Sequence, residues 1–131
     1  RAAFEMALAA ARERVQGGKP IVEHQAVATM LADMATNLDI ARTMVWRCAW
    51  AVNHQNPYDF TLGWKVKIFA SETAFNCARW GMEILGGAGI MQEAPMEKLL
   101  RDASTFLHSD GTNQVLRLRT SQAYAQGNVS F

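Results

Sequence analysis

The chain has little proline, little cysteine and almost no excess charge, and each shortage excludes a class of protein. Only three prolines occur among 131 residues, so long helices would meet few breakers. Thirteen basic and twelve acidic residues give a formal net charge of +1, which offers no support for binding nucleic acid or an anionic membrane. No uninterrupted apolar run reaches the length of a transmembrane helix, so we expect no membrane span.

The scarce cysteines and histidines limit the chemistry further. Cys48 and Cys77 both lie inside helical apolar patterns, which favours buried free thiols in a reducing compartment. The three histidines do not have the spacing of metal ligands, so we expect no metal site. The chain opens within a helical pattern at Arg1 and has no initiator methionine. We therefore expect a piece of a longer protein, without a signal peptide.

Helical patterning is abundant. Half of the residues are hydrophobic, which predicts one globular domain over residues 1–131. Helices are predicted for residues 1–15, 22–52 and 60–85, with Asp59 as a cap of the third. A short helix runs from Pro95 towards residue 106, and a last one starts at Thr112 or Asn113. No strand pattern competes anywhere, so the chain is predicted to be an all-α, up-and-down bundle.

The second predicted helix has the clearest periodicity. Its apolar residues recur at alternating steps of four and three, as in an a/d stripe that packs against other helices. This stripe does not decide whether those helices belong to the same subunit or to another. The four tryptophans are expected to fill the core or subunit contacts. The residues concerned are Val27, Leu31, Met34, Leu38, Ala41, Val45, Cys48 and Val52 for the stripe, and Trp46, Trp50, Trp64 and Trp80.

The segment DGTNQ, residues 110–114, brings a carboxylate together with several hydrogen-bonding side chains. One interpretation is a helix N-terminus that is capped by Asp110 or Thr112, with Gly111 in the turn. The other interpretation is proton chemistry, because an acid on a bend beside a helix start could act next to a bound ligand. The local pattern alone favours the helix cap.

Four segments occur in an order that resembles the C-terminal helical domain of the acyl-CoA dehydrogenases, flavoenzymes that desaturate acyl-CoA thioesters. They are RVQGGKPIVEHQ (14–25), ILGGAG (84–89), PMEKLLRD (95–102) and DGTNQ (110–114). These are similar to the family's R-x-x-F-G-x-x-I-x-x-x-Q, its glycine-rich loop, P-x-x-[KR]-x-x-R-D and E-G-T-x-Q. The resemblance implies an up-and-down four-helix bundle with extra short C-terminal helices. It also implies an N-terminal helical domain and a middle β domain that are absent from this chain.

The resemblance assigns the catalytic base to Asp110. Such a base removes a proton alpha to the thioester carbonyl, while hydride leaves the beta carbon for the flavin. The backbone N–H of the same residue would help to polarise the carbonyl. The family usually has Glu here. The shorter Asp implies either a substrate that sits closer, as in relatives acting on ring-bearing acyl groups, or a paralogue with altered chemistry.

Six further residues match positions that contact FAD in the family. Thr112 and Gln114 would contact the cofactor; the alternative is that both cap the last helix. Arg14 and Gln25 would reach the FAD of a neighbouring subunit, although Arg14 alone reads as a solvated residue at a helix end. Gly86 and Gly87 would let the backbone approach the cofactor; the alternative is a helix cap and loop.

Another departure bears on the same site: the family usually has Phe where this chain has Gly17.

The resemblance also implies partners. These are an acyl-CoA substrate, a homo-oligomer (dimer or tetramer) or a paralogous subunit, and electron-transfer flavoprotein or a similar electron acceptor. The implied compartment is the bacterial cytoplasm or the mitochondrial matrix. Two other hypotheses stay open: a non-catalytic subunit or paralogue that shares a cofactor or helps oligomerisation, and a helical interaction module with no cofactor.

Overall fold

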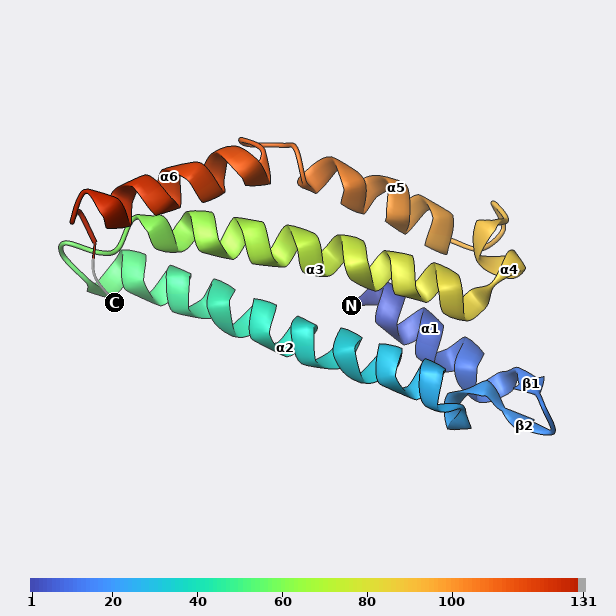
Figure 1. The fold of residues 1–131 in the computed structure, drawn as a ribbon. Helices are drawn as coiled ribbons and strands as arrows, with labels where there is room; N and C mark the ends of the chain where they lie inside the picture. The colour runs from blue at the N-terminus through green and yellow to red at the C-terminus, as the bar shows by residue number, and fades with distance from the viewer. Residues whose placement is uncertain (130–131) are drawn as a thin grey trace.

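The computed structural model describes residues 1–129 and shows six α-helices there, five of which surround one long central helix, α3 (Thr61–Leu85). α2 (Gln25–His54) runs antiparallel to α3 along its whole length (Figure 1). On the other side of α3, α5 (Met96–Phe106) and α6 (Asn113–Ala125) follow each other end to end. α1 (Ala2–Glu13) covers only one half of the molecule, where it packs against α2 and α3. The predicted all-α bundle is confirmed.

The predicted helices agree closely with those observed, but four short elements were not predicted. Where no strand was expected, β1 (Val15–Gln16) and β2 (Lys19–Pro20) form an antiparallel pair. Gly17 and Gly18 form the two-residue turn between them, with φ of 60° and 81°, and such a turn needs positive φ at both positions. A 3-10 turn, η1 (Ile21–Glu23), then leads into α2. The glycine-rich segment after α3 contains a single helical turn, α4 (Gly87–Ile90).

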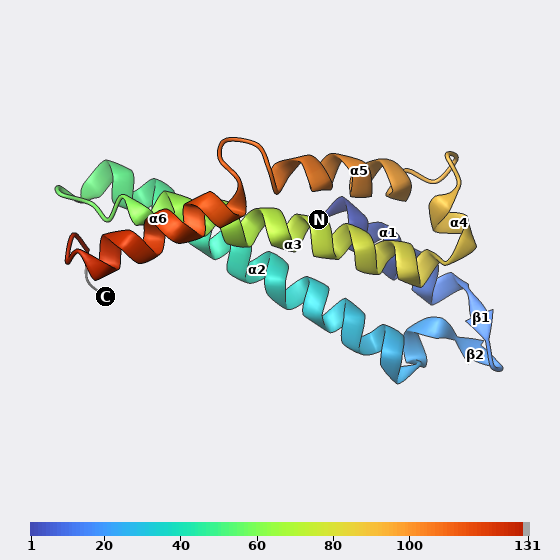
Figure 2. The same ribbon diagram turned by 45° about the horizontal axis from the view of Figure 1, so that its top comes forward.

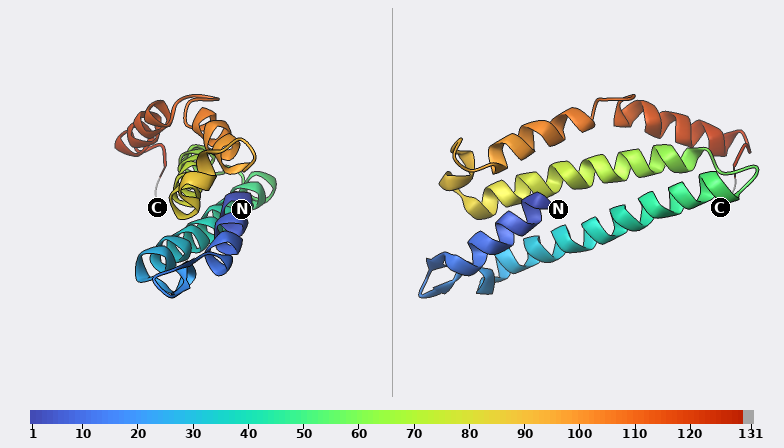
Figure 3. Two further views of the ribbon diagram at one scale, coloured as in Figure 1. Left: turned by 90° about the vertical axis from the view of Figure 1, so that its right-hand side faces the viewer. Right: turned by 180° about the vertical axis from the view of Figure 1, so that it is seen from behind.

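The core lies at the end of the molecule where four helices meet. Viewed end-on in the left panel of Figure 3, α1 and α2 lie on one side of α3 and α5 lies on the other. Small side chains on α1 allow this close approach, and Met34 and Met96 are fully buried between the helices. The core cluster contains Ala3, Ala7, Ala11, Ile21, Leu31, Met34, Cys77, Ala78, Ile84, Met96 and Ala103.

The apolar stripe of α2 is buried only where α1 covers it. Leu31 and Met34 are buried, but Val45 is 44% and Val52 is 53% exposed. Within the described residues the stripe therefore packs against helices of this chain over only part of its length, because α1 lies beside the first half of α2 alone. Figure 2 shows that α1 does not extend over the second half of α2.

The same bare half of α2 carries two of the four tryptophans. Trp46 is 66% and Trp50 is 54% exposed, so neither fills the core of this chain, whereas Trp64 and Trp80 are partly buried. The two cysteines are free, as expected. Cys77 is buried, which raises the pKa of its thiol, but Cys48 is only half-buried.

The turn between α2 and α3 is tied to α6. The N-cap residue of α3 is Phe60, one residue after the predicted Asp59, but Asp59 Oδ1 still accepts the backbone N–H of Thr61 at 2.8 Å and so binds the start of the helix. Asp59 Oδ2 also accepts a hydrogen bond from Lys65 Nζ at 2.8 Å. Lys65 in turn donates to the hydroxyl of Tyr124 on α6 at 2.6 Å. This network fixes the end of the bundle that α1 does not reach.

Candidate functional site

The connection between α5 and α6 carries Asp110 on a left-handed bend. Asp110 has φ of 54°, the only positive value for a non-glycine residue among residues 1–129, and Gly111 follows with φ of 91°. Such angles suit glycine and are tolerated by Asp. The Asp110 carboxylate is exposed and has no hydrogen bond or ion pair within the described chain. It is thus open to a ligand.

Asp110 lines a small hollow of about 260 Å³ against α3. The floor consists of short side chains, Ala70, Ser71 and Ala74, and Phe106 forms a wall from the end of α5. Lys67 also lines this hollow. Its surface is mostly apolar with a carboxylate at the rim, which suits an acyl chain whose reacting carbon lies beside the acid.

Asn113, the first residue of α6, joins the bend to α3. Its side chain is 3% exposed. Asn113 Oδ1 accepts a 2.7 Å hydrogen bond from Lys67 Nζ, and Lys67 also donates to the backbone carbonyl of Gly111 at 2.9 Å. Asn113 Nδ2 donates to Ser71 Oγ at 3.0 Å and to Glu72 Oε1 at 3.3 Å. Sequence reasoning missed this contact because the partners lie 41 to 46 residues apart in the chain.

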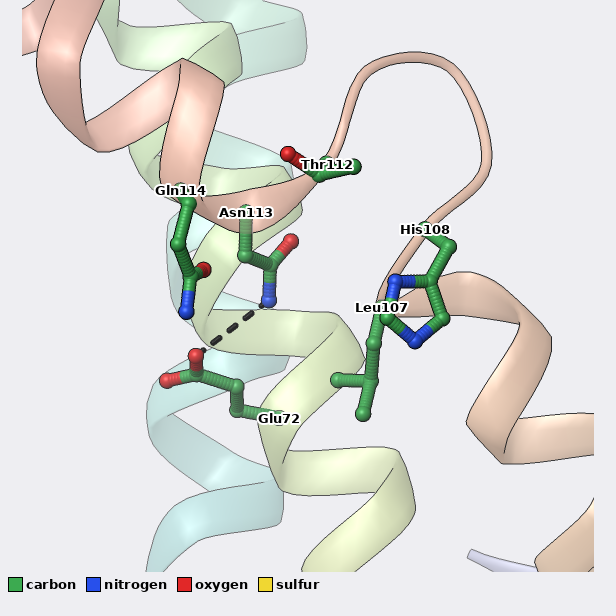
Figure 4. Close-up of a pocket in the computed structure, with 6 residues that line it drawn as sticks. All are labelled: Glu72, Leu107, His108, Thr112, Asn113 and Gln114. Atoms are coloured by element: carbon green, nitrogen blue, oxygen red, sulfur yellow. Dashed lines mark hydrogen bonds between the residues drawn. The ribbon is translucent and has the colours of Figure 1, made fainter.

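A second hollow lies on the other side of Asn113 (Figure 4). Glu72 and Gln114 line it, and Leu107, His108 and Thr112 come from the connection. The dashed line in Figure 4 marks the hydrogen bond between Asn113 and Glu72. Glu72 also forms an ion pair with Arg117 of α6 at 2.6 Å, so its carboxylate already has a charged partner within the chain.

Thr112 is a helix cap, as one interpretation predicted. Its Oγ1 accepts the backbone N–H of Val115 at 3.2 Å. A hydroxyl that accepts in this way keeps its own hydrogen for another acceptor, so the cap leaves Thr112 able to contact a ligand. Gln114 makes no cap; its Oε1 accepts a 3.4 Å hydrogen bond from Arg117. Asp110 does not cap α6 either, because Thr112 holds that position.

The other predicted cofactor residues lie at the opposite end of α3. Arg14 Nη1 donates to the carbonyl of Leu85 at 3.2 Å, and no carboxylate in residues 1–129 pairs with Arg14. Gly86 has φ of 62°, and a Cβ there would lie 3.2 Å from Arg14 Nη1. Arg14 and Gly86 share a third hollow with Gly17 and His24. The glycine at 86 therefore keeps the guanidinium face accessible.

Gln25 and Gly87 do not line that hollow, although each is adjacent in sequence to a residue that does. Both are exposed, and a Cβ on Gly87 would meet nothing within 4 Å. Gly89, by contrast, is buried and its absent side chain serves packing, since a Cβ would lie 3.1 Å from both Met82 and Leu85.

The predicted site residues therefore form two groups, not one. Ser71 beside the Asp110 bend and Leu85 beside Arg14 are fourteen residues apart on α3, which is about 21 Å along a helix. Arg101 and Asp102 of the PMEKLLRD segment hold neither group: they pair with Glu97 and Lys98 on their own helix.

Residues 1–129 contain neither a metal-binding cluster nor a membrane-spanning helix. No cluster of three or more His, Cys, Asp or Glu side chains is placed to hold a metal ion. None of the described helices combines the length and apolarity needed to cross a bilayer.

Comparison with known proteins identifies the family. A family model described as "Acyl-CoA dehydrogenase, C-terminal domain" matches residues 1–125. The probable acyl-CoA dehydrogenase YngJ of Bacillus subtilis is 41% identical over 117 residues, which make up 89% of this chain and 30% of that protein. A 3-sulfinopropanoyl-CoA desulfinase of Paraburkholderia xenovorans is 40% identical over 119 residues (91% and 30%).

Another relative and a solved structure extend this likeness. The cyclohexane-1-carbonyl-CoA dehydrogenase of Geobacter metallireducens is 36% identical over 116 residues (88% and 30%). The structure of butyryl-CoA dehydrogenase from Megasphaera elsdenii matches with a TM-score of 0.86 and 31% identity, over 95% of this chain and 32% of that one. The chain thus spans about a third of the length of these relatives. It belongs to the acyl-CoA dehydrogenase family of flavin-dependent oxidoreductases and corresponds to their C-terminal helical domain.

Proposed function

We propose that the full-length protein desaturates an acyl-CoA thioester between its alpha and beta carbons, with Asp110 as the base. The observation that supports this is the placement of Asp110: its carboxylate lacks a partner in the described chain, sits on a left-handed bend and borders an apolar hollow.

The proposed step removes one proton and one hydride from the substrate, and Asp110 takes the proton. Asp110 takes the proton from the alpha carbon, and the electron pair of that C–H bond forms the new double bond as hydride leaves the beta carbon. The Asp110 N–H would accompany this by donating to the thioester carbonyl, where negative charge develops. The proton held by Asp110 returns to solvent after the product leaves.

The hydride acceptor would be FAD, and this chain offers contacts for it in both groups of residues. When bound, the flavin supplies a two-electron acceptor for the hydride. Thr112 and Gln114 border the hollow beside Asp110 and offer a hydroxyl and an amide. Arg14 offers a guanidinium fork suited to a pyrophosphate, with Gly86 beside it. Gln25 and Gly87 flank that region.

The separation of the two groups supports an oligomer. Ser71 beside the Asp110 bend and Leu85 beside Arg14 are about 21 Å apart along α3, which is compatible with each group serving a different cofactor molecule. We therefore propose that Arg14 and Gln25 serve the FAD of a neighbouring subunit in a homo-oligomer. The N-terminal helical domain and the middle β domain would complete each site. Electron-transfer flavoprotein or a similar protein would reoxidise the flavin, in the bacterial cytoplasm.

The short base and the small residues beneath it favour a bulky acyl group. Asp is one methylene shorter than Glu, so the reacting carbon must approach the bend more closely. Ala70 and Ala74 leave room for that approach. The cyclohexane-1-carbonyl-CoA dehydrogenase relative acts on a ring-bearing acyl group, and we propose that class of substrate for this protein too.

The test uses the full-length protein with FAD, mixed with straight, branched and cyclic acyl-CoAs. Substrate-dependent bleaching of the flavin absorbance is expected, fastest with a cyclic substrate. Asp110→Asn should abolish bleaching while FAD stays bound. Asp102→Asn is the matched control, because it removes an exposed carboxylate on α5 that pairs only with Lys98. Bleaching by Asp110→Asn at the wild-type rate would refute the base assignment.

A second candidate is a family member that binds FAD without desaturating its substrate. A relative that is 40% identical is named as a 3-sulfinopropanoyl-CoA desulfinase, a name that describes a reaction other than desaturation, and this supports the second candidate. Flavin that binds but is not bleached by any acyl-CoA of the panel would support this candidate. Binding of FAD only after mixing with a homologous chain would support a shared site between unlike subunits.

A further inference from the structure

The bend that carries Asp110 is not held by its own backbone. Among the described residues, the N–H groups of Asp110, Gly111 and Thr112 have no backbone acceptor. Asp110 and Gly111 both adopt positive φ, and such a conformation persists only where the surroundings impose it. The backbone hydrogen bond that closes this loop runs from Asn113 N to Leu107 O at 3.1 Å. It joins the two ends of the loop and does not involve Asp110 or Gly111 at its tip.

The tip is held from α3 by Lys67. Lys67 Nζ donates to the Gly111 carbonyl at 2.9 Å and to Asn113 Oδ1 at 2.7 Å. Both bonds carry a full positive charge on the donor, which makes them stronger than bonds between neutral groups. The ammonium therefore joins the residue after Asp110 to the first residue of α6 and anchors both to the rigid central helix.

Asn113 presents its acceptor to Lys67 because its other polar atom is fully engaged. The two hydrogens of Nδ2 point to Ser71 Oγ and Glu72 Oε1. Ser71 Oγ accepts from Nδ2, and its single hydrogen has two acceptors within reach, the carbonyl of Ile68 at 3.1 Å and Asn113 Oδ1 at 3.3 Å. The flipped amide would place Nδ2 against an ammonium and Oδ1 against a carboxylate. The network thus admits one orientation of Asn113.

We propose that Lys67 and Asn113 form a clamp that positions Asp110 for proton abstraction. The inference rests on the proposed function of Asp110 and adds two positioning residues to it. Neither side chain needs to touch the substrate. By fixing the Gly111 carbonyl, the clamp fixes the preceding peptide and with it both groups that Asp110 would use, the carboxylate and the backbone N–H.

The consequence for the reaction is geometric. A misplacement of about 1 Å can lower a rate on the order of a hundredfold, although substrate binding is unchanged. Loss of Lys67 would free the Gly111 carbonyl and leave the buried Asn113 Oδ1 with no charged donor. The bend would then be expected to relax and the Asp110 carboxylate would lose its position, while other residues that line the hollow, Ala70, Ala74 and Phe106, stay in place.

Lys65 provides a matched control two residues away. Lys65 also lies on α3, is also partly buried, and also makes two hydrogen bonds outside the helix. Its acceptors are Asp59 and Tyr124, at the far end of α6 from the Asp110 bend. Lys65→Met and Lys67→Met therefore remove the same group from the same helix, but only Lys67→Met removes a restraint on Asp110.

The experiment compares these two variants in the full-length protein with FAD bound. Flavin bleaching is measured in single turnovers with saturating acyl-CoA, using substrate with and without deuterium at the alpha carbon. Lys67→Met is expected to lower the bleaching rate constant about 10- to 100-fold, with a larger isotope effect and an acyl-CoA dissociation constant within about threefold of wild type. Lys65→Met is expected to keep the wild-type rate constant and isotope effect. Ser71→Ala, a milder change that loosens Asn113, should lower the rate constant in the same direction.

Each result of this experiment either supports or overturns the clamp. A rate constant for Lys67→Met equal to that of Lys65→Met overturns the clamp, and so does a loss that resides wholly in the dissociation constant. If Lys67→Met does not fold, Ser71→Ala decides in the same way against Lys65→Met. Asp110→Asn separates this proposal from the proposed function. Inactive Asp110→Asn with fully active Lys67→Met refutes the clamp alone, whereas wild-type bleaching by Asp110→Asn refutes the base and removes the ground for the clamp.

Discussion

Gly81 on α3 lies directly beneath Met96, the first residue of α5, and this contact has no room for a side chain. A Cβ on Gly81 would lie 2.5 Å from Met96 Cε and 3.4 Å from the Ala3 carbonyl oxygen. Met96 is fully buried and cannot swing into solvent. Gly81→Ala should therefore lower the free energy of unfolding by about 1–3 kcal/mol, as overpacking does. Urea unfolding of the full-length protein followed by helical circular dichroism would measure it.

Gly63→Ala is the internal control for that prediction. Gly63 lies on the same helix, is exposed, and a Cβ there would meet nothing within 4 Å. Alanine should stabilise the helix at that position by about 0.5–1 kcal/mol. The same substitution at two positions of α3 is thus expected to change the free energy of unfolding in opposite directions. Equal effects would mean that Met96 adjusts without cost.

The Asp59–Lys65 pair predicts a pH-dependent contribution to stability. Burial alone would raise the pKa of Asp59, but hydrogen bonds from Lys65 and Thr61 outweigh it and the net pKa is lowered. Burial alone would lower the pKa of Lys65, but its bonds to Asp59 and Tyr124 raise it. The Asp59 contribution is present above the unfolded-state pKa of about 3.9 and is lost as pH falls through the folded-state value. The Lys65 contribution is present below about pH 10.4 and is lost as pH rises through the folded-state value.

Asp59→Asn should therefore cost about 1 kcal/mol at neutral pH, and that cost should shrink below about pH 4. The measurement is the difference in unfolding free energy between wild type and variant across pH. In a Lys65→Met background the same substitution should cost much less at pH 7, because the partner that stabilises the charge is gone. An undiminished cost in that background would show that Thr61, not Lys65, is the important partner.

Arg14 is expected to govern cofactor affinity. Arg14→Met keeps the length of the side chain but removes the guanidinium, so the full-length protein should bind FAD about tenfold more weakly or worse, as expected for loss of a charge-assisted pair. Fluorescence titration of apoprotein with FAD gives the dissociation constant. Arg12→Met is the control, since Arg12 is exposed in the last turn of α1. Equal affinity of the two variants would remove Arg14 from the proposed site.

Thr112 allows its two roles to be separated. Thr112→Asp keeps an oxygen that can accept the Val115 N–H, so the stability of α6 should be kept, whereas it has no hydroxyl hydrogen for a cofactor. Thr112→Ala should cost about 1 kcal/mol in unfolding free energy as well as FAD affinity. Thr112→Ser should preserve both. If Thr112→Asp binds FAD as wild type does, then Thr112 acts as a helix cap alone.

The sequence predicted most of the fold because helix boundaries depend on local chemistry. Thr112 as a cap, Asp59 at the start of α3 and the glycine after Leu85 are all properties of short segments. The extent of burial was less predictable. The stripe on α2 continues unchanged to Val52, but its burial depends on which helices lie beside it in space.

In the candidate site, too, features set by a short segment could be predicted and contacts between distant segments could not. Asp110 and Thr112 could be identified from a short motif, because the motif itself carries the carboxylate and the cap. Lys67 and Asn113 could not be paired from sequence, since neither belongs to a recognisable pattern and their contact spans 46 residues. The two-residue strands beside Gly17 were also missed, because two residues are too few to show alternation.

The central position of α3 has a consequence for local opening. It contacts α1, α2, α4, α5 and α6, so its backbone amides can exchange with deuterium only when several neighbours separate at once. We expect the middle of α3 to be the slowest-exchanging part of the described chain. Lys67 lies on the same helix, six residues after its start. The bend at Asp110 is thus fastened to the helix against which all the other helices pack, which would keep the geometry of the base constant while the surrounding surface fluctuates.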